Sequence, residues 1–203
     1  MQTVLSARSS SGHQAGISYW FNSLALAGIC TALLGGFYFQ LALGEIPCPL
    51  CMLQRVGLML VGLGFAMNVR FGASAVHYAI VILSSIVGAS VSVRQILLHI
   101  VPGDPGFGSA VFGYHMYTWG FVLFVASIIF SAVMLFIDRR KLDQADNDYG
   151  GASRGNAGSS RPVLTTVLIA LLLLLSAGNL VSDVLTCGAA ICADDPAGYI
   201  FQR

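Results

Sequence analysis

Residues 45–69, EIPCPLCMLQRVGLMLVGLGFAMNV, decide the fold because a Cys-x-x-Cys pair and an arginine lead directly into a long apolar run. A helix needs about 20 mostly apolar residues to cross about 30 Å of hydrocarbon, at about 1.5 Å per residue. The run that follows Cys51 has this length. A charge such as Arg55 is costly this close to lipid, so the segment indicates a functional site at the edge of a membrane span.

The composition of the whole chain agrees with a membrane protein. Of its 203 residues, 56% are hydrophobic and 9% are charged, against roughly 25% charged residues in ordinary soluble domains. The formal net charge of +1 gives no reason to expect nucleic acid or an acidic substrate as a partner. The sequence predicts an all-α, polytopic membrane protein with spans over residues 17–43, 50–69, 73–100, 113–137 and 163–184. The first span is too long for a signal-peptide core, so we expect it to be retained.

The basic residues near the ends of the spans predict the orientation. They gather on one side, at Arg8, Arg70, Arg139, Arg140, Lys141, Arg154 and Arg161. Cytoplasmic loops carry an excess of Lys and Arg, so we expect the N-terminus in the cytoplasm. The opposite connections carry acidic residues and no basic residue except the terminal Arg203, so the segment before the second span and the C-terminal tail are expected outside.

The polar segment over residues 138–162, DRRKLDQADNDYGGASRGNAGSSRP, divides the chain. It is rich in Gly and Ser and lacks the apolar residues of a core, so it predicts a flexible cytoplasmic linker. The expected organisation is a helix bundle over residues 1–137, this linker, and a fifth span with an external tail over residues 163–203.

Four of the five cysteines are expected on the oxidising side of the membrane, where disulfides persist. Cys48 and Cys51 form one outer pair, and Cys187 and Cys192 form the other. Cys30 lies within the first span, where a free cysteine usually behaves as a small buried apolar residue.

The first pair has local chemistry that favours reactivity. Pro49 suits the first position of a helix, because its missing N–H would have had no partner there. Cys48 would then be the N-cap, and Cys51 would lie in the first turn, where the helix dipole favours a thiolate. Arg55 follows Cys51 by four residues and shares its helix face. Arg55 could steady the thiolate, bind an electron-rich oxygen of a ligand, or snorkel to the interface.

Other sites remain open on the residues alone. Two outer cysteine pairs could bind zinc through four thiolates, although an oxidising compartment and the lack of a zinc-ribbon framework disfavour it. Covalent haem attachment is excluded because Met52 occupies the histidine position of C-x-x-C-H. His99 and His115, near outer span ends, could line a cofactor pocket or ligate a haem, or could make interhelical hydrogen bonds. No nucleotide-binding motif is present.

The segment from Pro47 to Arg55, PCPLCMLQR, resembles the P-C-x-L-C-x-x-Q-R signature of the bacterial disulfide bond formation protein B family, the quinone-reducing membrane thiol oxidases. Residues 113–119, GYHMYTW, and residues 187–196, CGAAICADDP, are similar to a large subgroup of that family. The resemblance covers roughly residues 20–137 and the tail. It implies a four-helix bundle in the bacterial inner membrane, extended here by a fifth transmembrane helix.

The resemblance also implies an activity. Electrons would pass from a periplasmic thioredoxin-fold dithiol oxidase to ubiquinone or menaquinone in the membrane. Cys48 would exchange with the second cysteine pair, Cys51 would face the quinone, and Arg55 would match the family's quinone-binding arginine. The best-known members carry their second pair between the third and fourth spans. Residues 101–112, VPGDPGFGSAVF, contain no cysteine, and the fifth span would instead deliver Cys187 and Cys192 to the outer face.

Two alternatives to this activity stay open. One is an enzyme of the vitamin K epoxide reductase type, which uses similar thiol and quinone chemistry in a helical bundle. The other is a membrane scaffold in which both outer cysteine pairs are static disulfide staples.

Overall fold

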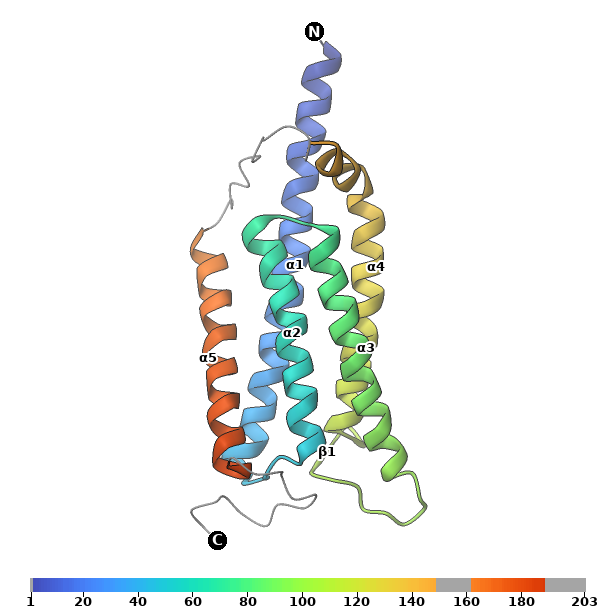
Figure 1. The fold of residues 1–203 in the computed structure, drawn as a ribbon, viewed down its shortest axis with the longest axis vertical. Coiled ribbons are helices and arrows are strands. Elements are labelled where there is room, and N and C mark those ends of the chain that lie inside the picture. The colour runs from blue at the N-terminus through green and yellow to red at the C-terminus, as the bar shows by residue number, and fades with distance from the viewer. Residues whose placement is uncertain (1, 149–161, 189–203) are drawn as a thin grey trace.

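The computed structural model describes residues 2–148 and 162–188, with side chains over residues 16–138 and 163–188. Within these residues, long helices run side by side in alternating directions (Figure 1). They are α1 (Gln2–Ala42), α2 (Pro49–Phe71), α3 (Ala75–Leu98), α4 (Met116–Asp148) and α5 (Pro162–Cys187). The predicted all-α polytopic fold is confirmed.

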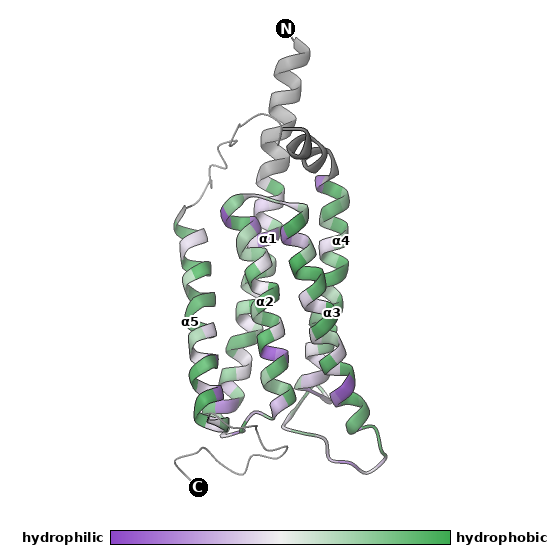
Figure 2. Cartoon of the chain, in the orientation of Figure 1, coloured by the Kyte–Doolittle hydropathy of each residue, from purple (hydrophilic) through white to green (hydrophobic). Residues whose placement is uncertain are grey.

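Each helix contains a segment that is long and apolar enough to cross a membrane. These segments are residues 16–42, 49–71, 75–98, 116–138 and 163–187, close to the predicted spans. Figure 2 shows hydrophobic residues along the coloured parts of helices α1 to α5. Many large apolar side chains are exposed on the outside of the bundle, among them Leu24, Leu41, Phe136, Val163 and Leu174. An apolar surface of this extent suits lipid, and the chain is a multi-pass membrane protein.

Helix α2 lies at the centre of the bundle. Half of its apolar segment is buried, against 28% of each other segment. It packs against all four other helices, whereas α5 packs against α1 and α2. The core joins Val61 and Phe65 of α2 to Leu26 of α1, Phe124 of α4 and Leu172 of α5. The site residues at the start of α2 are therefore held by the most enclosed helix of the molecule.

A buried polar network joins α1 to α4 at the end of the bundle opposite Cys48. Asp138 accepts hydrogen bonds from Ser18 at 2.6 Å and from the Tyr78 hydroxyl at 3.3 Å. Asn22 donates to that hydroxyl at 2.8 Å and accepts from Asn68 at 3.0 Å. Lipid gives no hydrophobic drive for helices to associate. Hydrogen bonds between helices therefore help to hold them together in one register.

A short hairpin precedes α4, where the sequence predicts that the fourth span begins at residue 113. Strand β1 (Ala110–Val111) pairs antiparallel with β2 (Tyr114–His115). Phe112 and Gly113, the two turn residues between them, both have positive φ, as a tight hairpin turn requires. The local turn thus replaces the first helical turn, and α4 begins only at Met116.

Helix α4 also ends later than the sequence predicts. It continues to Asp148, so residues 138–148 are helical although the predicted linker begins at 138. This stretch contains Leu, Lys, Arg, Gln and Ala, which favour helix, and the first pair of glycines follows only at residue 150. Residues 149–161 of the predicted linker lie outside the described residues.

Candidate functional site

The disulfide between Cys48 and Cys51 lies at the N-terminus of α2. Cys48 is the N-cap with extended backbone angles, and Pro49 occupies the first helical turn, both as predicted. The backbone N–H of Cys51 donates to the Cys48 sulfur at 3.1 Å. The N–H groups and the positive end of the helix dipole favour negative charge on sulfur at this position.

A buried glutamine of α3, which no sequence motif singled out, contacts both sulfurs of the disulfide. The Gln95 side-chain nitrogen lies 3.3 Å from the Cys48 sulfur and 3.4 Å from the Cys51 sulfur. Gln54 of α2 donates to the Gln95 carbonyl oxygen at 2.8 Å and so orients this amide. The available signal was a glutamine within an apolar span, because a buried amide in lipid needs a polar partner.

Arg55 lies one turn further along α2 and is bound by α1. Its guanidinium donates to the Gln40 carbonyl oxygen at 2.6 Å and to the backbone oxygen of Gly36 at 2.9 Å. It also lies 5.3 Å from the centre of the Phe37 ring, within the range of a cation–π contact. A Cβ at Gly36 would come within 3.2 Å of the guanidinium, so glycine leaves room for it. These contacts hold the charge inside the bundle.

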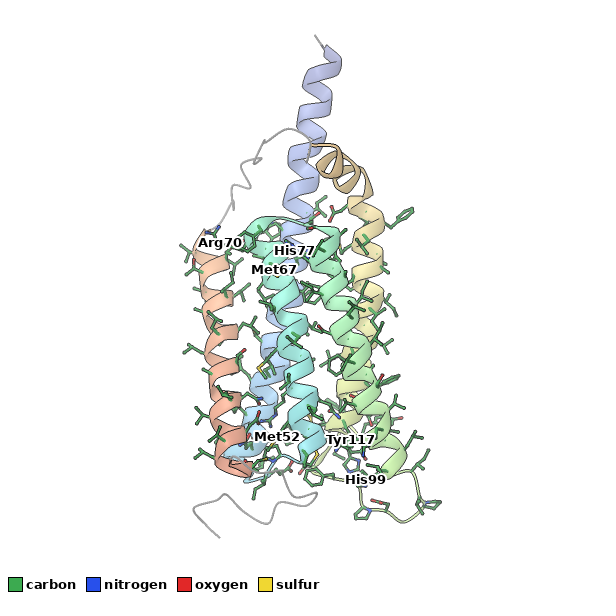
Figure 3. All side chains as sticks on the ribbon, in the orientation of Figure 1. Met52, Met67, Arg70, His77, His99 and Tyr117 are labelled. Atoms are coloured by element: carbon green, nitrogen blue, oxygen red, sulfur yellow. A yellow bond between two sulfur atoms is a disulfide. The ribbon has the colours of Figure 1, made fainter. Side chains whose placement is uncertain are left out.

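An apolar cavity of about 350 Å³ connects the disulfide to Arg55. Cys51, Gln54 and Arg55 contribute the α2 wall, and α1 adds residues that include Gln40. Met116, Trp119 and Gly120 of α4 are among the residues that close the far side. Tyr117, another lining residue, lies at the same end of the bundle as Met52 (Figure 3). The cavity therefore brings together residues of the PCPLCMLQR segment and residues of α4.

The connection between α3 and α4 contributes Phe107, Gly108 and Val111 to the lining of the cavity. Glu45 accepts hydrogen bonds from the backbone and hydroxyl of Ser109, which ties this loop to the segment before Cys48. Asp104 accepts a hydrogen bond from the Gly106 N–H at 2.7 Å and one from His99 at 3.1 Å. These two hydrogen bonds lower the pKa of the Asp104 carboxyl below its ordinary value. The loop is thus held by polar contacts at its two ends.

Neither His99 nor His115 is among the residues that line the cavity. Both rings stack on Tyr117, with centroids 5.8 Å and 5.3 Å from its ring. Within the described residues, no group of three or more His, Cys, Asp or Glu side chains could hold a metal ion. Both histidines therefore pack on Tyr117, and His99 also makes the hydrogen bond to Asp104.

The second cysteine pair is only partly described. Cys187 ends α5, and its sulfur lies 3.7 Å from the Met52 sulfur, next to Cys51 in the sequence. Cys187 is disulfide-bonded, and Cys192, with which the sequence analysis pairs it, lies outside the described residues. Cys30 is a free, buried cysteine of α1, as predicted. The end of α5 and the start of α2 therefore lie at the same end of the bundle (Figure 1).

Comparisons with known proteins give a consistent family. Residues 18–109 match the model of the family described as Disulfide bond formation protein DsbB. Disulfide bond formation protein B of Pseudomonas syringae is 44% identical over 87 residues, which cover 40% of this chain and 51% of that protein. Disulfide bond formation protein B 1 of Pseudomonas fluorescens is 41% identical over 85 residues, 39% of this chain and 50% of that protein. Disulfide bond formation protein B of Chromobacterium violaceum is 38% identical over 86 residues, 40% of this chain and 52% of that protein.

These matches cover only part of this chain and part of each relative. The chain spans about half the length of the curated relatives it matches, and no solved structure matches it. The family match contains Cys48, Cys51, Arg55 and Gln95, and it ends at residue 109, before α4 and α5. Over the disulfide and its surroundings, the chain is therefore similar to the disulfide bond formation protein DsbB family.

Proposed function

We propose that the chain is a membrane thiol oxidase that takes electrons from a periplasmic thioredoxin-fold dithiol oxidase and passes them to ubiquinone or menaquinone. This activity would support disulfide bond formation in other proteins. The observation that carries the proposal is the position of Cys51, which belongs both to a disulfide and to the wall of an apolar cavity. A disulfide in that position suits an electron acceptor that is dissolved in lipid.

The cavity fits a quinone head group in size and in chemistry. Its volume of about 350 Å³ lies within the usual range of ligand pockets, about 300–1,000 Å³. Its walls are mostly apolar, and Arg55 brings N–H groups that can donate hydrogen bonds to a carbonyl oxygen. A bound quinone supplies an acceptor for two electrons and two protons.

The residues around the disulfide support release of those electrons. When two thiols at Cys48 and Cys51 become a disulfide, one S–S bond forms and two electrons and two protons leave. The thiolate is the reactive form of a cysteine, and an N-terminal helix position stabilises it. The Gln95 amide lies within reach of both sulfurs and would donate to a thiolate at either one.

Electrons would reach this pair by thiol–disulfide exchange. We expect the Cys187–Cys192 pair to accept two electrons from the partner dithiol and to pass them to Cys48. In each exchange one S–S bond breaks and another forms, so electrons and protons balance. The contact between the Cys187 and Met52 sulfurs supports this route, because it brings the end of α5 beside the first pair.

The orientation follows from the same proposal. Both cysteine pairs would face the periplasm across the bacterial inner membrane, with the N-terminus in the cytoplasm. The arrangement of basic residues in the sequence supports this orientation. The partner oxidase would then approach the end of the bundle that carries Cys48 and Cys187.

A direct assay tests the activity. Purified protein would be mixed with a reduced thioredoxin-fold partner and a quinone, and quinone reduction would be followed by absorbance. We expect Cys51→Ser to abolish catalytic turnover, because a disulfide can no longer form beside the cavity. The matched control is Cys30→Ser, which removes a buried free cysteine of α1 and should keep turnover within about twofold.

Two results would count against the proposal. Normal turnover in Cys51→Ser would remove the first pair from the reaction. Failure of the inserted wild-type protein to reduce quinone with any dithiol would favour static disulfide staples.

A further inference from the structure

Helix α5 contacts residues of α1 that hold Arg55 in place. This helix lies outside the segment that matches the family model. Gly178, Ser182 and Thr186 follow one another at intervals of four residues and share one face of α5. Ser182 and Thr186 are buried, and small residues on one face let helices approach closely. This face lies against α1 and α2.

A hydrogen-bonded relay runs from α5 to the guanidinium. The Gln40 side-chain nitrogen donates to the Ser182 hydroxyl at 2.6 Å, and the Gln40 carbonyl oxygen accepts from Arg55 at 2.6 Å. Gln40 and Ser182 are only 4% and 5% exposed, so water cannot easily replace either contact. Arg55 can only donate, so it requires the Gln40 oxygen to face it, and the Ser182 hydroxyl accepts from the nitrogen of the amide in that orientation.

A second contact of α5 reaches the guanidinium through the Phe37 ring. A Cβ placed at Gly178 would lie 3.3 Å from the Phe37 ring, so α5 packs closely behind this ring. The Phe37 ring in turn faces Arg55 at 5.3 Å. Asp183, beside Ser182 in the sequence, interacts electrostatically with Arg55.

From these contacts we propose that α5 is a positioning element of the quinone site, in which Ser182 acts through Gln40 to orient Arg55 toward the cavity. The inference rests on the proposed function for the identity of the ligand. It extends that function by giving the fifth helix a role in quinone affinity besides carrying a cysteine pair. Ser182 is a positioning residue, because it acts through Gln40 and is not among the residues that line the cavity.

Quinone binding can be measured without turnover, because Trp119 lines the cavity. The chain has two tryptophans, so in a Trp20→Phe background quenching of Trp119 reports the Kd of a short-chain ubiquinone. We expect Ser182→Ala to raise this Kd about three- to tenfold, the loss typical of one hydrogen bond. The matched control is Ser176→Ala, which removes a hydroxyl that donates to the Leu172 backbone within α5. It should leave Kd within about twofold.

Two further variants separate positioning from a change in packing. Ser182→Thr keeps the hydroxyl and should keep Kd near the wild-type value. In an Arg55→Met background the relay has nothing left to orient, so Ser182→Ala should then change Kd by less than about twofold.

Three results would overturn the inference: an unchanged Kd in Ser182→Ala, an equal loss of affinity in Ser182→Thr, or an undiminished loss in the Arg55→Met background. A wild-type protein that binds ubiquinone with the expected pattern but does not oxidise a dithiol would remove the proposed function alone. A wild-type protein that binds neither ubiquinone nor menaquinone would overturn both.

Discussion

At the scale of single residues, the most informative group is the Gln95 amide. It is 1% exposed, and its nitrogen contacts both sulfurs of the Cys48–Cys51 disulfide. The same donor would make a stronger, charge-assisted hydrogen bond to a thiolate than to a disulfide sulfur. Stabilising the reduced form makes a cysteine pair more oxidising. Gln95 is therefore expected to tune the redox potential of the first pair.

Gln95→Leu should make the reduction potential of the Cys48–Cys51 pair more negative. Hydrogen bonds to charged groups contribute about 1.5–3 kcal/mol, which corresponds to a shift of roughly 30–60 mV for two electrons. The measurement is equilibration in defined thiol–disulfide buffers, followed by alkylation of the free thiols. Ser90→Ala is a suitable control, since its hydroxyl donates to the Ile86 backbone of the same helix. If Gln95→Leu had the same reduction potential as the wild type, the Gln95 amide would have a structural role only.

At the scale of helices, close packing depends on glycines that face aromatic rings. The fully buried Phe124 ring of α4 lies against Gly88 of α3 and Gly57 of α2. A Cβ at Gly88 would collide with this ring. Lipid gives no hydrophobic drive for helices to associate, so van der Waals contact of this kind holds the bundle together.

Gly88→Ala should therefore destabilise the bundle even though alanine favours helix. Overpacking costs about 1–3 kcal/mol, which exceeds the roughly 1 kcal/mol gained in helix propensity over much of that range. The control is Gly28→Ala on α1, where no atom lies within 4 Å of the added Cβ. Thermal unfolding in detergent should give a lower midpoint for Gly88→Ala than for Gly28→Ala. Equal midpoints would show that α3 and α4 can separate at little cost.

At the scale of the whole molecule, the alternating helices give the bundle two distinct ends. Cys48 and the last residue of α5, Cys187, lie at one end, as the contact between Cys187 and Met52 requires. Arg70, Met67 and His77 lie at the other (Figure 3). A protein of this shape can keep its Cys48–Cys51 disulfide and Arg70 on opposite sides of a membrane.

Fusion reporters should reveal these two sides. A reporter fused after Gly150 should lie in the cytoplasm, and one fused after Arg203 should lie outside, because basic residues concentrate between α4 and α5. The measurement compares an enzyme that is active only outside with a fluorescent protein that folds only in the cytoplasm. If both sites reported the same side, α5 would not span the membrane, and Cys187 would need another route to Cys48.

The sequence by itself determined the features that depend on local chemistry. The number and approximate ends of the membrane spans follow from apolar length, and Cys48 as the N-cap follows from Pro49. It also brought Cys51 and Arg55 to one helix face, because residues four apart are neighbours on a helix. The PCPLCMLQR motif pointed to the same family whose model matches residues 18–109.

Only the tertiary structure decided which polar groups meet. Gln54 and Gln95 contact each other across 41 positions of sequence, and Gln40 and Ser182 across 142. Hydropathy gives the length of a span but not the rotation of one helix about its axis relative to another. That rotation is set by packing between side chains distant in the sequence. For this reason the partners of the disulfide and of Arg55 appear only when the helices are assembled.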